Sequence, residues 1–282
     1  MKLVRFGAAG AEKPGLLDAQ GVVRDLSQHI KDITGETLAP ASLDKLRKLD
    51  PLSLPAAPSQ VRLGSPVGDV RNFIAVGLNY IDHAKETGAE IPKEPILFNK
   101  LPNCIVGPND DVMIPKGSLK LDYEIEIAFV IGQRARYVSE TDALSYVAGY
   151  TICNDISERH FQAERGGQWM KGKCAETFGP LGPWLVTREE IPNVQALSMS
   201  LDVNGQRRQT GNTETMIFGI QHCVHYISQF MVLEPGDVVT TGTPPGVALG
   251  MKPPVWLQAG DLMTLKIQGL GEQKQKVVAF KD

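Results

Sequence analysis

The stretch Leu121-Asp-Tyr-Glu-Ile-Glu-Ile-Ala-Phe-Val-Ile131 carries two glutamates within a run of β-branched and aromatic residues. This composition predicts a β-strand. Side chains two positions apart on a strand share a face, so Glu124 and Glu126 point the same way and the alternate residues form an apolar core face. Burying two neighbouring carboxylates is costly unless a cation or protons neutralise them. A divalent metal ion would do so, and a solvated acidic face is the alternative.

The composition of the chain excludes several classes of function. The 282 residues are enough for one large domain, or for a medium domain with a small one. The net charge of −3 predicts no nucleic-acid partner. No apolar run reaches about 18 residues, so we expect no membrane span, and residues 1–10 lack the apolar stretch of a signal peptide. The four separated cysteines form no Cys-x-x-Cys pair, which favours a reducing cytoplasm.

The first 70 residues are predicted to form a small N-terminal α/β subdomain, and residues 71–282 the main domain. A hairpin is expected over residues 15–23, with its turn near Gln20-Gly21. A short amphipathic helix is expected over residues 42–49, with Ser42 as its cap. The proline-rich residues 51–58 predict a linker.

From residue 71 onward the pattern predicts mostly strands. Residues 71–76 predict a buried strand, and residues 197–203 alternate before the hairpin signal Asn204-Gly205. A further strand is expected around residues 263–267. Two helices are predicted, over residues 139–146 and 213–230. The expected fold class is therefore α+β, mostly β.

Asp155 is the third candidate acidic ligand, because it follows the predicted strand at residues 150–154. A carboxylate at a strand end can join Glu124 and Glu126, although an isolated aspartate there is more typical of a helix cap. Three carboxylates with no adjacent His or Cys favour a hard cation. Mg²⁺ is the first choice, with Mn²⁺ and Ca²⁺ as alternatives.

His83 and Glu86 have the spacing of neighbours on one turn of a helix. A glutamate beside a histidine orients the ring and raises its basicity, which suits a general base. The alternative is a solvent-facing His–Glu pair. The following residues 88–95 are bounded by Gly88 and Pro95, and they could form a lid beside the base.

Lys173 follows the glycine-containing residues 166–172. A lysine near a metal ion could stabilise a developing enolate, whereas an isolated lysine is more typical of a solvated surface. His222 and His225 also have helical spacing, but that helix is needed for packing and no metal role is predicted for them.

The turn Gly242-Thr-Pro-Pro-Gly246 lacks the Gly-Lys-Ser/Thr of a Walker phosphate loop. Thr243 could still hold a ligand through its hydroxyl and backbone.

Together these segments resemble the fumarylacetoacetate hydrolase family over roughly residues 71–282. The shared motifs are Gly77-Leu-Asn-Tyr80, His83 with Glu86, Asp122-Tyr-Glu-Ile-Glu126, Asn154-Asp-Ile-Ser-Glu-Arg159, Gln162, Gly172-Lys173 and Thr241-Gly-Thr-Pro-Pro-Gly246. Each motif is weakly specific alone, but their order and separations are those of the family. The resemblance therefore outweighs the surface alternatives given above.

The resemblance implies a mixed β-sandwich roll that works as a homodimer or a higher assembly of dimers. It implies a Mg²⁺ or Mn²⁺ ion held by Glu124, Glu126 and Asp155, with His83 and Glu86 ordered over the site when ligand binds. The positions that match substrate or oxyanion contacts are Arg159, Gln162, Lys173 and Thr243, and Lys100 matches a further position lining the site.

Residues 164–173 and 10–18 resemble the hydrolases of 2,4-diketo-3-deoxy sugar acids of the L-rhamnonate and L-fuconate type. Such an enzyme cleaves the C3–C4 bond of a 2,4-diketo acid to give pyruvate and a carboxylic acid such as lactate. Glu176 and His160 depart from the family pattern, which bears on substrate choice.

Other activities stay open on the same residues. They are decarboxylation of oxaloacetate, isomerisation of a hydroxydienoate, dehydration of a sugar acid and ureidoglycolate lyase activity. A keto-acid-binding protein without catalysis is the alternative outside the enzymes.

Overall fold

Three β-sheets organise the chain in the computed structural model, which describes residues 1–281. The largest sheet has ten strands, ordered β3 (Val23–Asp25), β2 (Lys13–Leu17), β1 (Lys2–Phe6), β12 (Gly179–Thr187), β10 (Val147–Asn154), β9 (Ile125–Ile131), β15 (Val238–Thr240), β4 (Phe73–Gly77) and β5 (Ile96–Lys100), with β6 (Ile105–Val106) beside β12. The second sheet has five strands, β14 (Gln206–Asn212), β13 (Ser198–Val203), β16 (Leu262–Ile267), β17 (Gly271–Val278) and β7 (Val112–Met113). In the third, β8 (Leu121–Asp122) pairs with β11 (Ser157–Glu158). The predicted class, α+β and mostly β, is confirmed.

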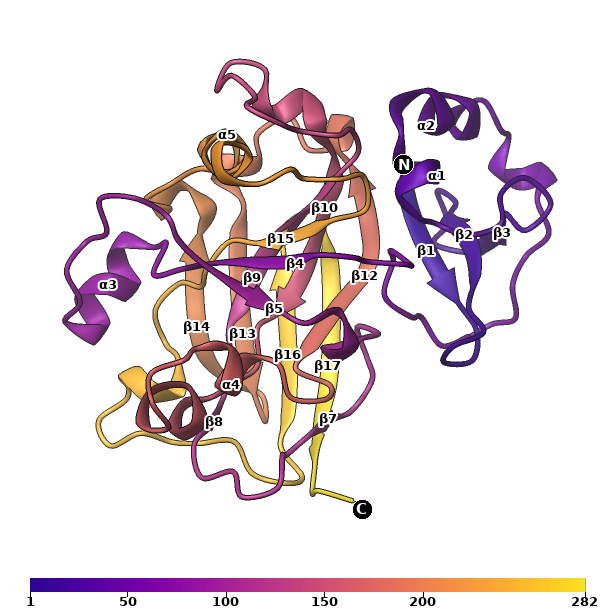
Figure 1. Cartoon of the computed structure of the whole chain (residues 1–282). Coiled ribbons are helices and arrows are strands. Elements are labelled where there is room, and N and C mark those ends of the chain that lie inside the picture. Colours follow the sequence, from indigo (N-terminus) through magenta and orange to yellow (C-terminus); the bar gives the residue numbers. More distant parts are fainter. Residues whose placement is uncertain (282) are drawn as a thin grey trace.

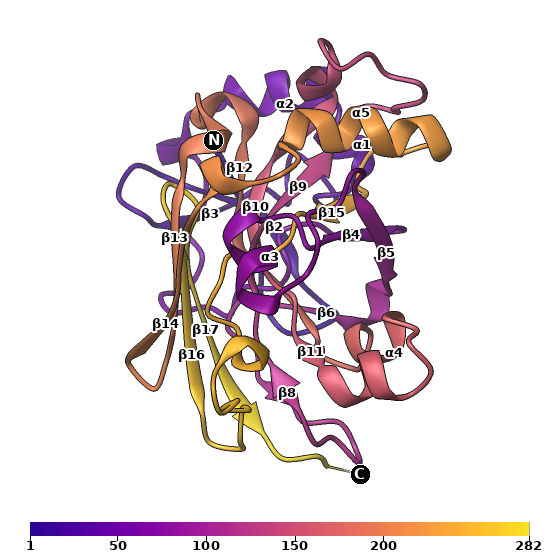
Figure 2. The ribbon, with the colours of Figure 1, turned by 90° about the vertical axis from the view of Figure 1, so that its left-hand side faces the viewer.

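The helices are few and short. They are α1 (Gly35–Leu38), α2 (Pro40–Arg47), α3 (Ile81–Thr87), α4 (Met170–Lys173) and α5 (Ile220–Phe230), with a π-helical turn at His160–Glu164. Single 3₁₀ turns lie at Pro51–Ser53, Pro102–Cys104, Ala143–Tyr146, Arg188–Glu190, Val194–Ala196, Thr213–Thr215 and Ala248–Gly250. In Figure 1, α5 lies at the top of the main body and α3 at its left edge. In Figure 2, the five-stranded sheet lies at the left and β5 at the right, with α3 towards the viewer. No helix of residues 1–281 has both the length and the apolar character needed to cross a bilayer.

The N-terminal strands extend the large sheet. β1 pairs with β12, where Leu3 lies opposite Leu185, and Figure 1 shows β1–β3 with α1 and α2 grouped at the right. The predicted hairpin is confirmed, because β2 and β3 pair antiparallel around a turn with Gly21 at φ 79°. The prediction that Ser42 caps the next helix is wrong. That helix begins at Pro40, whose fixed φ suits a first helical position.

The acidic stretch at residues 121–131 is buried along its whole length, which rules out a solvated acidic face. Asp122 is 0% exposed, Glu124 5% and Glu126 2%. The single predicted strand is interrupted, because β8 ends at Asp122 and β9 begins at Ile125. At the break, the Glu124 N–H donates to the Asn154 side chain and the Glu124 carbonyl accepts from the Asp155 N–H. The chain therefore passes from the two-stranded sheet into the large sheet at Glu124.

Two predicted helices are shorter than expected. Over residues 139–146 only the turn Ala143–Tyr146 is helical, because Ser139 and Asp142 hydrogen-bond to each other and compete with a regular helix. The long helix starts at Ile220 rather than at residue 213. The backbone N–H groups of Ile217 and Phe218 donate to Asn79, which holds this segment extended. The hairpin at Asn204-Gly205 and the strand around residues 263–267 are confirmed as β13–β14 and β16.

Candidate active site

Glu124, Glu126 and Asp155 converge in space. One carboxylate oxygen from each lies within 4.8 Å of the others, and residues 1–281 contain no other such group of potential metal ligands. The sheet register explains this: Cys153 of β10 lies opposite Glu126 of β9, so the strand end brings Asp155 beside Glu124. All three side chains are buried. The structure thus brings together the three predicted metal ligands.

Three buried cations surround this triad. Lys173 Nζ donates to Glu124 at 2.6 Å and to Asp155 at 2.8 Å, and Lys100 Nζ donates to the other oxygen of Asp155 at 2.6 Å. Arg159 bridges Glu124 and Asp122, at 2.5 and 2.8 Å. These contacts hold the carboxylates in fixed orientations. They also hold the pKa of Arg159 above its usual range, since its two acidic partners outweigh the opposing effect of burial.

Glu126 is the one acid of the triad held by neutral donors. Its Oε2 accepts from the Thr240 hydroxyl at 2.5 Å and from the Gly242 N–H at 2.8 Å. Burial, together with the neighbouring carboxylates of Asp155 and Glu124, raises the pKa of Glu126 well above its usual range. In contrast, Arg159 and Lys173 outweigh burial at Glu124 and lower its pKa. The pKa values of these two neighbouring carboxyls are thus shifted in opposite directions, because Glu124 is hydrogen-bonded to two cations and Glu126 to none.

The chemistry of this cluster fits a divalent cation. The four carboxylates of Asp122, Glu124, Glu126 and Asp155 meet the three cations of Lys100, Arg159 and Lys173, which leaves one negative charge in excess. All three prospective ligands are carboxylate oxygens, as hard ions such as Mg²⁺ prefer. A bound divalent ion would give the cluster one net positive charge, which suits a monoanionic ligand.

His83 and Glu86 lie on α3, as their spacing predicted. His83 Nδ1 lies 3.0 Å from Glu86 Oε2, and Glu86 Oε1 accepts from the Gly246 N–H at 2.9 Å. Gly250 packs against this carboxyl group: an added Cβ would lie 2.5 Å from the Glu86 carboxyl carbon, so a larger residue would displace the Glu86 side chain. With Nδ1 facing Glu86, the Nε2 of His83 makes no hydrogen bond within residues 1–281 and is available to a ligand. His83 is 6% exposed, so the alternative of a solvent-facing histidine does not hold.

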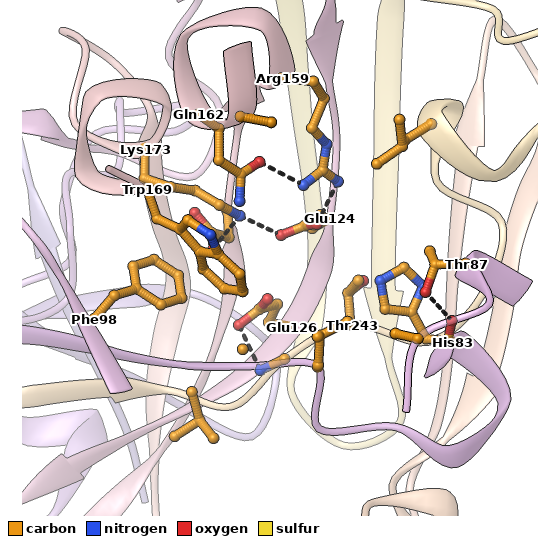
Figure 3. A pocket seen from close by; sticks show the side chains of 18 residues that line it. His83, Thr87, Phe98, Glu124, Glu126, Arg159, Gln162, Trp169, Lys173 and Thr243 are labelled. Atoms are coloured by element: carbon orange, nitrogen blue, oxygen red, sulfur yellow. Dashed lines mark hydrogen bonds and ion pairs between the residues drawn. The ribbon is translucent and has the colours of Figure 1, made fainter. Parts of the chain in front are cut away.

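A cavity of about 260 Å³ joins the acids to the histidine. Its wall includes all three acids of the triad, His83, and the predicted ligand-binding residues Arg159, Gln162, Lys173 and Thr243. In the view of Figure 3, His83 lies at one side and Trp169 with Phe98 at the other, with Glu124 and Glu126 between them. Leu78, Ala89 and Leu249 add apolar surface.

Lys100 and Thr243 occupy less direct positions than predicted. Lys100 is absent from the cavity wall, and its Nζ lies behind Asp155, donating also to the Lys173 carbonyl. The Thr243 hydroxyl donates to the Ile125 carbonyl and accepts from Gln209, so its proton is already committed within the protein. Gln162 keeps more freedom, since its Oε1 accepts from Arg159 and its amide N–H₂ stays unpaired within residues 1–281.

Three further residues contribute to the site without having been predicted. Asp122 accepts from Arg159 and from the Ala248 N–H, and Thr240 orients Glu126. Trp169 lines the cavity opposite the histidine. Asp122 shares the period-two face of Glu124 and Glu126 in the sequence, which is a signal that could have identified it. Thr240 and Trp169 carry no such signal because they come from other segments.

The chain matches the fumarylacetoacetate (FAA) hydrolase C-terminal family over residues 72–278. It is 55% identical over 276 residues to a Burkholderia multivorans protein provisionally named a hydrolase, with 98% of each chain covered. The fumarylacetoacetate hydrolase of Exiguobacterium antarcticum has a similar structure, with 36% identity, a TM-score of 0.88, and 99% and 100% of the two chains covered. So does the 2-hydroxyhepta-2,4-diene-1,7-dioate isomerase of Mycobacterium marinum, at 30% identity and a TM-score of 0.77, with both chains covered fully.

Proposed function

Because the chain belongs to the fumarylacetoacetate hydrolase family, we propose that it hydrolyses the C3–C4 bond of a 2,4-diketo acid with the help of a divalent metal ion. The observation that carries this proposal is one cavity that contains a buried carboxylate triad, two cations and a carboxylate-oriented histidine. Relatives are hydrolases and isomerases, so this step goes beyond the family assignment.

The triad and its cations form the binding half of the site. Glu124, Glu126 and Asp155 would hold Mg²⁺ or Mn²⁺, which when bound supplies a Lewis acid for the 2-oxo group. Arg159 and Gln162 lie where they can receive the substrate carboxylate, and Lys173 presents a buried ammonium to negative charge on oxygen. These groups fix the first three carbons of the substrate and stabilise charge that develops there.

His83 forms the proton-transfer half of the site. Glu86 holds Nδ1, so Nε2 takes a proton from a water molecule in the cavity. The resulting hydroxide adds to C4, and the C3–C4 bond breaks with its electron pair delocalised towards the C2 oxygen. C3 then takes back the proton held on His83. The products are pyruvate and the carboxylic acid that contains C4.

The charges of the cavity support a substrate with an uncharged tail. The cations that line it within residues 1–281 are Arg159 and Lys173, and each already contacts two carboxylates. A bound divalent ion would leave the cluster with one net positive charge, which the C1 carboxylate of the substrate would neutralise, so a second carboxylate on the tail would meet no unmatched cation. A 2,4-diketo-3-deoxy sugar acid of the rhamnonate or fuconate type meets this requirement, and its hydrolysis gives pyruvate and lactate.

The test is a screen of acylpyruvates and 2,4-diketo-3-deoxy sugar acids with saturating Mg²⁺ or Mn²⁺ and pyruvate as the readout. We expect pyruvate to be released in equal amounts with the second acid, and one ¹⁸O atom from H₂¹⁸O to enter that acid. Failure to turn over any of these compounds would exclude the hydrolase. Binding of 2-oxo acids with no hydrolysis, isomerisation or decarboxylation would favour a keto-acid-binding protein.

Isomerisation of a hydroxydienoate is a second candidate, favoured by the Mycobacterium marinum neighbour that is named as a dioate isomerase. Adding a hydroxydienoate and oxaloacetate to the screen separates the activities, because an isomerase changes the absorption spectrum of the hydroxydienoate without releasing pyruvate or taking up ¹⁸O. Release of CO₂ from oxaloacetate would instead indicate a decarboxylase.

We also propose a homodimer, as the family resemblance implies, in a cytoplasmic enzyme. Tyr137 and Phe230 are each 65% exposed, and the Tyr137 N–H donates to the Ser228 carbonyl near the end of α5. Large exposed aromatic side chains that gather in one place favour a contact with another chain. Sedimentation velocity should give twice the 30.7 kDa chain mass, and a monomer at all concentrations would contradict the proposal.

A further inference from the structure

Trp169 stands between two cavities. Trp169 and Phe98 line both the active-site cavity of about 260 Å³ and a second cavity of about 360 Å³. The second cavity opens at the surface, since its wall includes Leu101, Met170 and Met231, which are 40%, 45% and 39% exposed. The two aromatic side chains therefore form the partition between the active site and this outer cavity.

Two contacts hold the indole in the partition. Its ring packs edge-on against Phe98, with ring centroids 5.3 Å apart. On the other side it approaches the backbone of Gly77, where an added Cβ would lie 2.5 Å from Cζ3 of Trp169. A glycine at position 77 thus leaves the space that the indole fills. Trp169 lies just before α4, the helix that carries Lys173, so the partition is tied to the catalytic cavity.

The sizes of the two cavities indicate that this partition affects which substrates can bind. The active-site cavity is smaller than a typical ligand pocket, so it accommodates a small acid. Beyond the indole, the outer cavity is lined mainly by apolar side chains such as Ile74 and Leu97. A tail that passed the partition would enter this larger apolar space.

We propose that Trp169 is a specificity-determining residue that limits the length of the substrate's acyl tail. Its indole closes the end of the active-site cavity and excludes tails that would extend into the outer cavity. This inference rests on the proposed function, because it requires that the first three carbons of the substrate bind at the acidic triad. It assigns to Trp169 no part in proton transfer.

The experiment compares wild type with Trp169→Ala, Trp169→Phe and Met170→Ala. Met170→Ala is the matched control, because Met170 neighbours Trp169 in sequence but lines the outer cavity alone. Two readouts are used with saturating Mg²⁺. One is kcat/KM for acylpyruvates with acetyl, butanoyl, hexanoyl and octanoyl tails. The other is calorimetric affinity for unreactive linear 2-oxo acids from pyruvate to 2-oxooctanoate.

We expect wild type to favour short tails. Trp169→Ala should raise the long-to-short ratio about tenfold or more in both readouts, since a single methylene in an apolar pocket already contributes about tenfold. Trp169→Phe keeps an aromatic ring in the partition and should stay close to wild type, as should Met170→Ala. An unchanged length preference in Trp169→Ala, or the same shift in Met170→Ala, would overturn the proposal.

The two readouts separate this inference from the hydrolase assignment. A shift in 2-oxo acid affinity without turnover of any acylpyruvate would uphold the role of Trp169 and reject the hydrolase. Turnover of acylpyruvates with no change in length preference in Trp169→Ala would uphold the hydrolase and reject the role of Trp169. If wild type bound no 2-oxo acid with saturating metal, both the hydrolase assignment and the role of Trp169 would be rejected.

Discussion

Glu124 and Glu126 are two residues apart, yet their surroundings differ in charge. Glu124 contacts Arg159 and Lys173, whereas Glu126 contacts a hydroxyl and a backbone N–H. At Glu124, the two cations outweigh the effect of burial and lower the pKa of the carboxyl group. At Glu126, burial and the neighbouring negative charges raise the pKa. The same substitution at these two positions should therefore affect stability in different ways.

We predict that Glu124→Gln and Glu126→Gln both lose metal-dependent binding of oxalate but differ in stability without metal. Glu124→Gln removes charge-assisted hydrogen bonds and should cost about 1.5–3 kcal/mol of unfolding free energy. Glu126→Gln removes a buried carboxyl without a cationic partner and should leave stability unchanged or higher. Calorimetry with Mg²⁺ and oxalate, and denaturant unfolding in EDTA, measure the two effects.

Glu94→Gln is the control, because Glu94 lies at the surface and accepts from the Tyr226 hydroxyl. Oxalate affinity that survives in Glu124→Gln would remove Glu124 from the metal site.

His83→Ala should lower kcat by about 10² to 10⁴, the usual contribution of a general base. Oxalate affinity should hardly change, because the three acids and their cations stay in place. Stopped assays for pyruvate measure kcat, and calorimetry measures the affinity for oxalate. The matched control is His222→Ala, since His222 pairs with Glu140 outside the cavity. Activity near that of wild type in His83→Ala would assign the base to another group.

At the scale of elements, tertiary contacts decide where helices begin and end. The apolar stripe of α5 is in the sequence, but Asn79 keeps the preceding residues extended and delays the start to Ile220. Likewise, the acidic strand breaks at residues 123–124 because the backbone of Glu124 bonds to Asn154 and Asp155. Local propensity cannot predict either boundary, since the partners come from distant segments.

The β2–β3 turn provides a test of stability against pH. Burial raises the pKa of Asp18, but the Val22 N–H, the Arg24 side chain and the Gln20 N–H outweigh it and hold this pKa below its usual range. Because the folded value is the lower one, the stabilisation is present above the unfolded pKa of about 3.9 and is lost as pH falls through the folded value.

The Asp18→Asn variant should therefore be less stable than wild type at pH 6, and the difference should shrink towards pH 3. Denaturant unfolding at both pH values measures it. A difference that stays constant between pH 6 and pH 3 would contradict the assigned role of the Asp18 carboxylate.

At the scale of the whole molecule, the N-terminal 70 residues continue the large sheet. The family match begins at residue 72, and a boundary after residue 70 stays a prediction. Nevertheless, β1 pairs along β12, and Leu3 and Val4 are fully buried. Arg62 joins the two parts through Asp110, at 2.6 and 2.8 Å. The N-terminal part therefore protects a strand edge of the main domain.

A chain of residues 71–282 should consequently be less soluble and unfold at a lower temperature than the full protein. Without β1, the β12 strand becomes an open edge that can pair with other chains. Light scattering and thermal unfolding compare the two proteins. A truncated chain with an unchanged unfolding temperature and no aggregation would show that the two parts are independent.

Three features follow from the order of the residues alone: the mostly β class, the shared face of Glu124 and Glu126, and the contact between His83 and Glu86. These features depend on spacing along one strand or one helical turn, which local backbone geometry sets. Asp155 and Lys173 were candidates from their local sequence, and the resemblance to the family favoured them over the alternatives and added Arg159.

Two features depend on the folded chain: which charged side chains of the active site neutralise one another, and which side chains close its cavity. The tertiary structure placed Lys100 behind Asp155, gave Arg159 a second partner in Asp122, and set Trp169 against Gly77. These contacts join residues that are 37 to 92 positions apart in the sequence. They form because a buried charge is stable only with a partner and a buried apolar surface only when it is closely packed. Spacing along the chain carries no record of such pairings.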